Sequence, residues 1–244
     1  MNVMMLNGNL TADAVAYHPG TERAAVRFRI ACSRKTAGAE GSVDFFNVVA
    51  FGKLAERASG LRKGDSAMVV GKCHNVTYQN QAGEAVRRIE LYADEIHPAN
   101  SGAGVNCFSL AGNIVKDPEI RYTAGEKPLA VVRTRICVFR PSASKEGNND
   151  FFDIEAFGSV AENAEKYLKK GDQVFVQGRL TEYEWQDEEG KKHHSSKVTG
   201  CRITYLGKRK DDGDCLQKDE ATIASCGGFV SVPEEFGGED FPFH

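Results

Sequence analysis

Residues 44–52 read DFFNVVAFG, and residues 150–158 read DFFDIEAFG. Both stretches combine aromatic with β-branched residues and contain no proline, so each is predicted to form a strand. Adjacent residues of a strand point to opposite faces. One phenylalanine of each Phe-Phe pair is therefore expected in the core, and we assign that position to Phe46 and Phe152.

The match between the two halves extends in both directions from this stretch. The sequence of Asn2–Leu10 matches that of Asn106–Ile114 at an offset of 104 residues. Lys63-Gly64-Asp65 recurs as Lys170-Gly171-Asp172 at an offset of 107. The offset grows by single residues, as small loop insertions make it. A period of this length is too long for a solenoid and indicates a duplicated domain.

The duplication predicts the domain organisation of the 244-residue chain. The two domains are expected at residues 1–98 and 105–208. The linker at 99–104 is rich in small residues, which favour a flexible connection. Residues 209–244 form the remaining tail.

Each repeat is predicted to be mostly β with one short helix. Ala25–Ala31 alternates apolar and polar residues, the period of a half-buried strand, and residues 131–138 repeat this pattern. A helix is expected at Lys53–Leu61 and again at Ser159–Leu168, where Val160, Ala164 and Leu168 share one helical face. Strands with a single short helix after the third fit a five-stranded Greek-key barrel, the OB-fold. The predicted fold is therefore all-β, with two tandem OB-fold barrels and a disordered acidic tail.

Composition excludes several classes of protein. The chain is 41% apolar and 27% charged, as globular proteins are. No run of eighteen apolar residues and no secretory signal occurs, so we expect no membrane segment and a cytoplasmic location. The chain has seven cysteines, an odd number, and no two of them form a CxxC motif. Reduced thiols are therefore expected, without a disulfide framework or a metal site.

The net charge of −3 is unevenly distributed. Residues 211–244 hold one lysine and nine acidic residues, whereas residues 1–100 carry a net +2 and residues 101–210 a net +3. Such asymmetry points to a nucleic-acid partner or an interaction tail, with a merely solvated tail as the plain alternative.

Motifs of catalysis are missing from the sequence. There is no phosphate-binding loop, GxSxG or HExxH. Lys210-Asp211-Asp212-Gly213 matches the Lys-x-Asp-Gly motif of ligases, but it lies at the start of the tail, where no folded domain surrounds the lysine. We therefore expect a binding protein without a cofactor, and not an enzyme.

The second repeat contains LAGN at 110–113, DPEIRY at 117–122, FG at 157–158, YLKKG at 167–171, VQGRL at 176–180 and Trp185. In this order the motifs resemble the bacterial single-stranded DNA-binding protein family. The first repeat resembles the same family at residues 6–10, 51–56 and 61–64, but it lacks the DPEIRY run and has no tryptophan.

The resemblance implies a surface that binds single-stranded DNA. Binding single strands without reading sequence requires cations along the phosphates and rings on which bases stack. The family's stacking rings map onto Phe45, Phe51 and Tyr78 in the first repeat and onto Phe151, Phe157 and Trp185 in the second. Since strand aromatics are usually buried, core packing is the alternative for these phenylalanines.

Basic residues accompany the rings. Arg27 and Arg29, like Arg133 and Arg135, are spaced i, i+2 and share a strand face, which suits a phosphate path. A solvated outer face is the open alternative. The other candidate phosphate contacts are Lys53, Arg62, Lys63, Lys169 and Lys170.

At one position the chain departs from the family. Where family members have arginine after the aromatic pair, this chain has Asn47 in the first repeat and Asp153 in the second. The lost charge favours an alternative function, an OB-fold adaptor that docks replication or recombination proteins and binds DNA weakly or not at all. Retention of all six rings favours the DNA-binding protein.

The C-terminal end, Asp240-Phe241-Pro242-Phe243, resembles the family's acidic tip, to which replication and repair proteins bind. His244 follows it, so the terminal carboxylate is one residue further on. Family members with two OB-folds per chain form dimers. The resemblance therefore implies a nucleoid-associated homodimer that presents four OB-folds.

Overall fold

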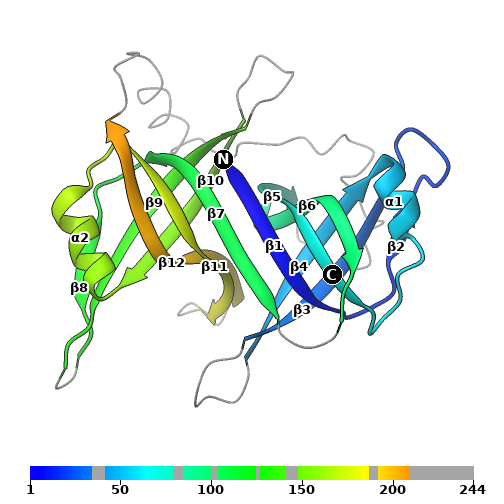
Figure 1. The fold of residues 1–244 in the computed structure, drawn as a ribbon, viewed down its shortest axis with the longest axis horizontal. Helices are drawn as coiled ribbons and strands as arrows, with labels where there is room; N and C mark the ends of the chain where they lie inside the picture. Colours follow the sequence, from blue (N-terminus) through cyan, green and yellow to red (C-terminus); the bar gives the residue numbers. More distant parts are fainter. Residues whose placement is uncertain are drawn as a thin grey trace. The chain divides into compact units, whose positions relative to one another are not determined.

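The computed structural model describes residues 1–34, 42–79, 85–100, 104–124, 127–140, 148–186 and 192–208. Figure 1 shows these residues as strands with two short helices. The first repeat contains β1 (Asn2–Leu10), β2 (Val15–Tyr17), β3 (Ala25–Arg34), β4 (Ser42–Phe51), α1 (Gly52–Ala58), β5 (Ser66–Gln79) and β6 (Ala85–Pro98). The second contains β7 (Val105–Ile114), β8 (Glu119–Tyr122), β9 (Ala130–Arg140), β10 (Asn148–Phe157), α2 (Ser159–Tyr167), β11 (Asp172–Gln186) and β12 (Lys192–Lys208).

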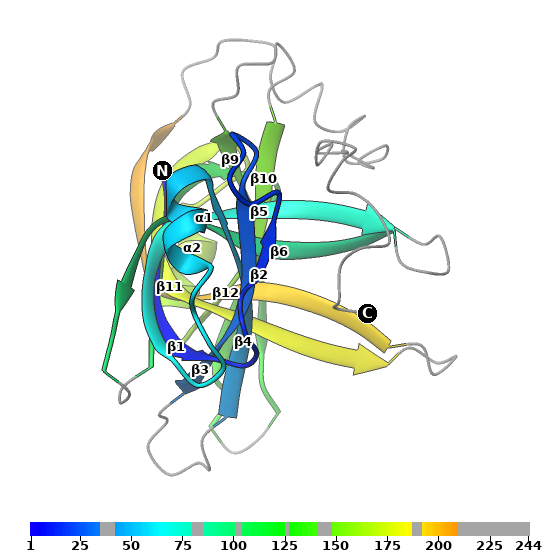
Figure 2. The ribbon, with the colours of Figure 1, turned by 90° about the vertical axis from the view of Figure 1, so that its right-hand side faces the viewer.

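The strands of each repeat pair in a closed order. β1 pairs antiparallel with both β3 and β5, β3 pairs with β4, and β4 pairs parallel with β6, which neighbours β5. The second repeat has the same order, β7-β9-β10-β12-β11, with β11 beside β7. In Figure 2, β5 with β6 and β11 with β12 are long neighbouring strands. These circuits confirm the predicted OB-fold barrels.

The described chain forms two compact units. The first unit comprises Met1–His74, Glu90–Leu110 and Val176–Arg202. The second comprises Asn75–Ile89, Ala111–Phe175 and the described residues from Ile203 onward. The units do not follow the repeat boundary. Most of β11 and β12 is grouped with the first repeat, and parts of β5 and β6 are grouped with the second.

Alternating side chains build the core of each unit. Along β3, Val26, Phe28 and Ile30 are buried, whereas the arginines between them are not fully buried. The aromatic pairs divide as predicted, since Phe46 and Phe152 expose at most 3% of their surface. The pleat of the strand therefore places one ring of each pair in the core and leaves its neighbour on the other face.

The helices are close to their predicted positions but shorter. α1 ends at Ala58, and the Leu61 N–H then bonds to the Ala58 carbonyl oxygen and turns the chain. α2 ends at Tyr167, because Leu168 has an extended backbone. The buried residues of α2 are Ala161 and Ala164, and Val160 is only half-buried. The buried face of α2 therefore begins at Ala161 and not at the predicted Val160, whereas Ala164 and Leu168 are buried as expected.

None of the described helices is long and apolar enough to cross a membrane. Four cysteines within the described ranges are free thiols: Cys32, Cys73, Cys107 and Cys137. The same ranges hold no cluster of metal-ligating side chains.

Candidate nucleic-acid interface

Rings and arginines share one face of the strand pairs β3–β4 and β9–β10. The register places Arg29 opposite Asn47 and Arg135 opposite Asp153. Phe45 and Phe151 lie two residues before these partners and so point to the same side of their strands. Phe45 is 39% exposed, and Phe151 is half-buried. Both rings have accessible surface on the face that carries the arginines.

Phe51 and Phe157 end their strands at equivalent places. Each precedes a glycine with positive φ, +57° at Gly52 and +60° at Gly158, and the chain then enters a helix. The N–H groups of these glycines donate to the Ala24 and Ala130 carbonyl oxygens at 2.8 and 2.9 Å. The sharp turn leaves Phe51 47% and Phe157 39% exposed. Both rings are thus available to stack on a base.

Phe51 belongs to a ring cluster that the sequence analysis missed. Tyr92 packs edge-on against Phe51 at a centroid distance of 5.4 Å and against His74 at 4.8 Å. A hollow of about 400 Å³ lies beside these rings and is also lined by Leu54, Lys72, Ala93 and Asp94. Lys72 and Asp94 form an ion pair at 3.5 Å. Tyr92 lies beside Phe51 because β6 pairs with β4, and His74 contacts Tyr92 from β5. No local motif in the sequence marks either residue.

Three tyrosines of the described residues have a cation over the ring, and one of them, Tyr167 with Lys166 at 5.0 Å, lies on α2. Arg88 lies 5.2 Å from the ring centroid of the predicted Tyr78, and Lys197 lies 5.2 Å from that of Tyr183. Tyr183 is 40% exposed and was not predicted; its position two residues before Trp185 in the sequence is the signal that could have found it. The backbone of Trp185 belongs to β11, but its side chain lies outside the described residues. A cation beside a ring can contact a phosphate while the ring stacks on a base.

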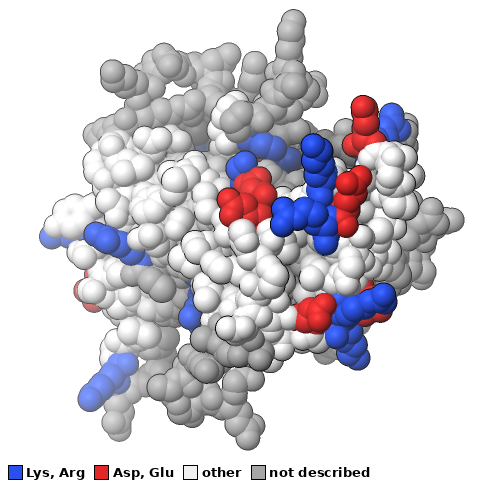
Figure 3. Space-filling model, turned by 45° about the vertical axis from the view of Figure 1, so that its right-hand side comes forward, with Lys and Arg blue, Asp and Glu red and all other residues white. Residues whose placement is uncertain are grey.

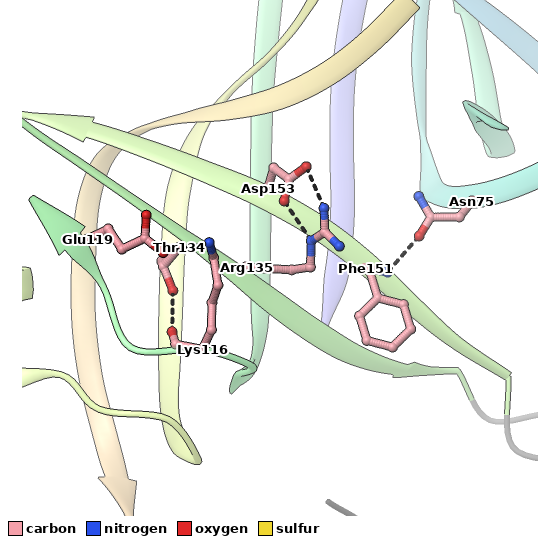
Figure 4. A network of polar contacts seen from close by, with 7 residues as sticks. All are labelled: Asn75, Lys116, Glu119, Thr134, Arg135, Phe151 and Asp153. Carbon is pink, nitrogen blue, oxygen red and sulfur yellow. Dashed lines mark hydrogen bonds and ion pairs between the residues drawn. The ribbon is translucent and has the colours of Figure 1, made fainter. Parts of the chain in front are cut away.

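The predicted strand arginines differ in their partners. Arg27 pairs with buried Glu90 at 3.3 Å, and Arg133 pairs with buried Glu155 at 2.9 Å. Arg135 forms two parallel hydrogen bonds with Asp153, at 2.7 and 3.0 Å (Figure 4). Arg29 instead lies over the ring of Phe45, 4.8 Å from the centroid. The carboxylate partners were not anticipated from the sequence, because strand register brings them to the arginines, from β6 for Glu90 and from β10 for Asp153 and Glu155.

The basic turns before β5 and β11 are built alike. The Lys63 N–H donates to Asp13 at 2.8 Å, and the Lys170 N–H donates to Asp117 at 2.7 Å. The hydrogen bond from the Lys63 backbone lowers the pKa of Asp13, against the effect of desolvation and with help from Arg62. The side chains of all predicted basic turn residues are exposed: Arg62, Lys63, Lys169 and Lys170. Lys53 is exposed on α1.

Charge on the visible face of Figure 3 is mixed, with lysine and arginine side chains next to acidic ones. The candidate interface consists of rings, some of which have a cation beside them. The predicted tip residues Asp240, Phe241, Pro242 and Phe243 lie outside the described residues.

Comparison with known proteins gives a consistent result. A model of the single-strand binding protein family matches residues 1–99 and 105–206. The chain is 28% identical over 233 residues to the single-stranded DNA-binding protein of Deinococcus radiodurans, covering 85% of this chain and 76% of the relative. For the Thermus thermophilus protein of that name the identity is 27% over 222 residues, covering 84% and 81%.

A shorter relative and a solved structure agree. Single-stranded DNA-binding protein 1 of Xylella fastidiosa is 32% identical over 129 residues, which cover 48% of this chain and 95% of the relative. The crystal structure of the wild-type Thermus aquaticus single-stranded DNA binding protein has a TM-score of 0.67 at 25% identity, covering 86% of this chain and 95% of the other. The expectation of a binding protein without catalysis agrees with this family. Since the family model spans both repeats, the chain belongs to the single-strand binding protein family.

Proposed function

We propose that this chain binds single-stranded DNA without sequence selectivity and coats and protects it during replication, recombination and repair. The observation that carries the proposal is the cation beside an accessible ring, seen for Arg29 with Phe45, Arg88 with Tyr78 and Lys197 with Tyr183. Each pair offers a phosphate contact and a stacking surface, which recognise any base. The names of the Deinococcus and Thermus relatives support the same function.

The proposed binding surface comprises the six rings and nine cations expected from the sequence. The rings are Phe45, Phe51, Tyr78, Phe151, Phe157 and Trp185. The cations are Arg27, Arg29, Lys53, Arg62, Lys63, Arg133, Arg135, Lys169 and Lys170. We place these residues in two OB-fold domains, 1–98 and 105–208, with a linker at 99–104.

The test is fluorescence anisotropy of a labelled oligo-dT at two salt concentrations, with duplex DNA as competitor. We expect binding that weakens with salt, because phosphate contacts release counterions, and little competition by the duplex. Intrinsic fluorescence adds a site-specific signal, since Trp185 is the single tryptophan. Failure of the folded protein to bind oligo-dT would reject this function.

Ring variants test the proposed stacking. Replacing Phe151 and Trp185 together with alanine should weaken oligo-dT binding by a few kcal/mol, since each stacked base contributes about 1–3 kcal/mol. Tyr205→Ala is the control, because Tyr205 is 47% exposed on β12 but is not a proposed contact. Equal affinities of the double variant and the control would remove both rings from the proposed surface.

We further propose that Asp240–Phe243 recruits replication and repair proteins and that the chain is a homodimer presenting four OB-folds. The tail supplies acidic charge and two aromatic rings near its end. Deleting residues 234–244 should abolish capture of such partners while leaving oligo-dT binding unchanged or tighter. Weaker oligo-dT binding after the deletion would contradict the recruitment role.

The proposed homodimer is tested by light scattering. The measured mass should be twice the 26.6 kDa of one chain.

One observation favours the adaptor with weak DNA binding. Arg133 and Arg135 are neutralised by Glu155 and Asp153, so the strand face of the second repeat offers little net charge to a phosphate. A folded protein that captures partners through its tip but fails to bind oligo-dT would be this adaptor.

A further inference from the structure

The two repeats differ at one equivalent position on the ring-bearing face. Arg29 and Arg135 occupy the same place in the duplicated strand pairs. The residue directly opposite is Asn47 in the first repeat and Asp153 in the second. Residues opposite one another on neighbouring strands interact directly. A neutral amide therefore faces one arginine, and a carboxylate faces the other.

In the second repeat the carboxylate takes up the guanidinium. Nε of Arg135 donates to Oδ1 of Asp153 at 2.7 Å, and a terminal nitrogen donates to Oδ2 at 3.0 Å. Figure 4 shows the two parallel contacts. These hydrogen bonds raise the pKa of Arg135, against the effect of burial. A carboxylate and a phosphate bind the same fork of an arginine, so Asp153 occupies the donors that a phosphate would use.

In the first repeat the residue opposite the guanidinium is neutral Asn47, and no ion pair of Arg29 occurs among the described residues. Arg29 lies over Phe45, with its guanidinium carbon 4.8 Å from the ring centroid. Within the described ranges, its Nε is buried and without a hydrogen-bond acceptor. Phe45 itself is 39% exposed. The site thus combines a ring that can stack on a base with a cation that has no carboxylate partner among the described residues. Because Nε is buried, a phosphate would bind the terminal nitrogens of Arg29.

We propose that the two repeats contact single-stranded DNA unequally, with Arg29 and Phe45 forming a phosphate-and-base site while Asp153 acts as an internal competitor that keeps Arg135 from the phosphates. Asp153 is a positioning residue, since it acts through Arg135. The inference rests on the proposed DNA binding and assigns the larger share of it, at this position, to the first repeat. It removes Arg135 from the cations of the proposed surface for as long as Asp153 holds it.

A reciprocal exchange tests the proposal in the full-length chain. Asn47→Asp places a carboxylate opposite Arg29, and Asp153→Asn removes the one opposite Arg135. One phosphate contact on a single strand changes the slope of log affinity against log salt by about 0.7, which is about fivefold in affinity at about 0.1 M salt. We expect N47D to bind oligo-dT about fivefold more weakly with a shallower slope, and D153N to bind about fivefold more tightly with a steeper slope.

Matched controls separate this effect from net charge. Asn163→Asp and Glu165→Gln make the same charge changes at exposed positions of α2. Their affinities should change less than twofold. If N47D and D153N change affinity no more than these controls do, the proposal is overturned. Wild-type protein that does not bind oligo-dT would instead reject the proposed function, so the two failures are distinguishable.

Arginine variants keep the test decisive if an exchange variant does not fold. Arg29→Gln should weaken binding about fivefold, whereas Arg135→Gln should change it less than twofold. Adding R135Q to D153N should abolish the gain in affinity, because Asp153 acts through Arg135. Equal losses from R29Q and R135Q, or a gain that survives in the double variant, would overturn the assignment.

Discussion

Asn106 and Leu180 are joined by two hydrogen bonds. Nδ2 of Asn106 donates to the Leu180 carbonyl oxygen at 2.7 Å, and the Leu180 N–H donates to Oδ1 of Asn106 at 3.1 Å. Asn2 makes the same two contacts with Cys73, at 2.6 and 3.0 Å. In both cases one side-chain amide satisfies a peptide N–H and a peptide C=O, which would otherwise need another partner.

Asn106→Ala should therefore destabilise the protein. The variant removes both partners of the Leu180 peptide groups, and a buried polar group left unsatisfied costs about 1–3 kcal/mol. We expect a lower urea midpoint in a denaturation experiment. Asn163→Ala is the control, since Asn163 is exposed on α2 and alanine favours a helix. A midpoint of N106A as high as that of the control would contradict the structural role.

The paired phenylalanines should separate stability from binding. Phe46 is 3% exposed, and its replacement with alanine should cost about 3–5 kcal/mol of unfolding free energy through lost burial and the cavity left behind. Phe51 is 47% exposed, so Phe51→Ala should retain most of the stability. It should weaken oligo-dT binding by about 1–3 kcal/mol, the contribution of one stacked base. Thermal unfolding and anisotropy on both variants check this, and a stable F46A would be the unexpected result.

Gly178 should tolerate no side chain. A Cβ atom at this position would meet the backbone carbonyl oxygen of Thr199 on the neighbouring strand, and at Gly71 it would meet that of Tyr92. Backbone cannot move aside as a flexible side chain can, so we expect Gly178→Ala to lower the melting temperature strongly or to prevent folding. Gly60→Ala is the matched control, because nothing lies within 4 Å of the added atom. Similar melting temperatures for the two variants would contradict the close strand approach.

Asp13 should contribute to acid sensitivity. Its folded-state pKa lies below the ordinary value of 3.8, chiefly because the Lys63 N–H donates to its carboxylate. A group with a depressed pKa stabilises the fold above its unfolded pKa, and this contribution is lost as the pH falls through the folded value. Asp13→Asn cannot titrate, so its urea midpoint should fall less steeply than that of the wild type below about pH 4. Identical pH profiles between pH 6 and pH 3 would argue against the role of Asp13.

Much of the fold followed from local pattern. The alternation in Ala25–Ala31 and the Phe-Phe pairs predicted the strands and the inward rings, because burial on one face of a sheet requires a period of two. The exact face of α2 was less certain. Ala161 rather than Val160 is buried, since the turn at Gly158 sets the rotation at which the helix meets its strands.

The sequence predicted which residues belong to the candidate site better than it predicted which of them contact one another. Phe45, Phe51 and Phe157, which the resemblance named, are exposed, and their role in DNA binding stays a prediction. Tyr92 was not predicted, because it approaches Phe51 only through the parallel pairing of β4 with β6. Nothing in the local sequence around Tyr92 indicates that partner.

The sequence by itself determined the duplication, the β class and the family, since strand period, turn residues and motif order are properties of short stretches. Only the tertiary structure decided which charges remain available. Arg29 and Arg135 are equivalent in sequence, yet Arg135 is held by Asp153 and Arg29 lies over Phe45. The physical reason is that an arginine's charge is compensated by whatever strand pairing brings within hydrogen-bond distance, and cross-strand register is a property of the folded sheet.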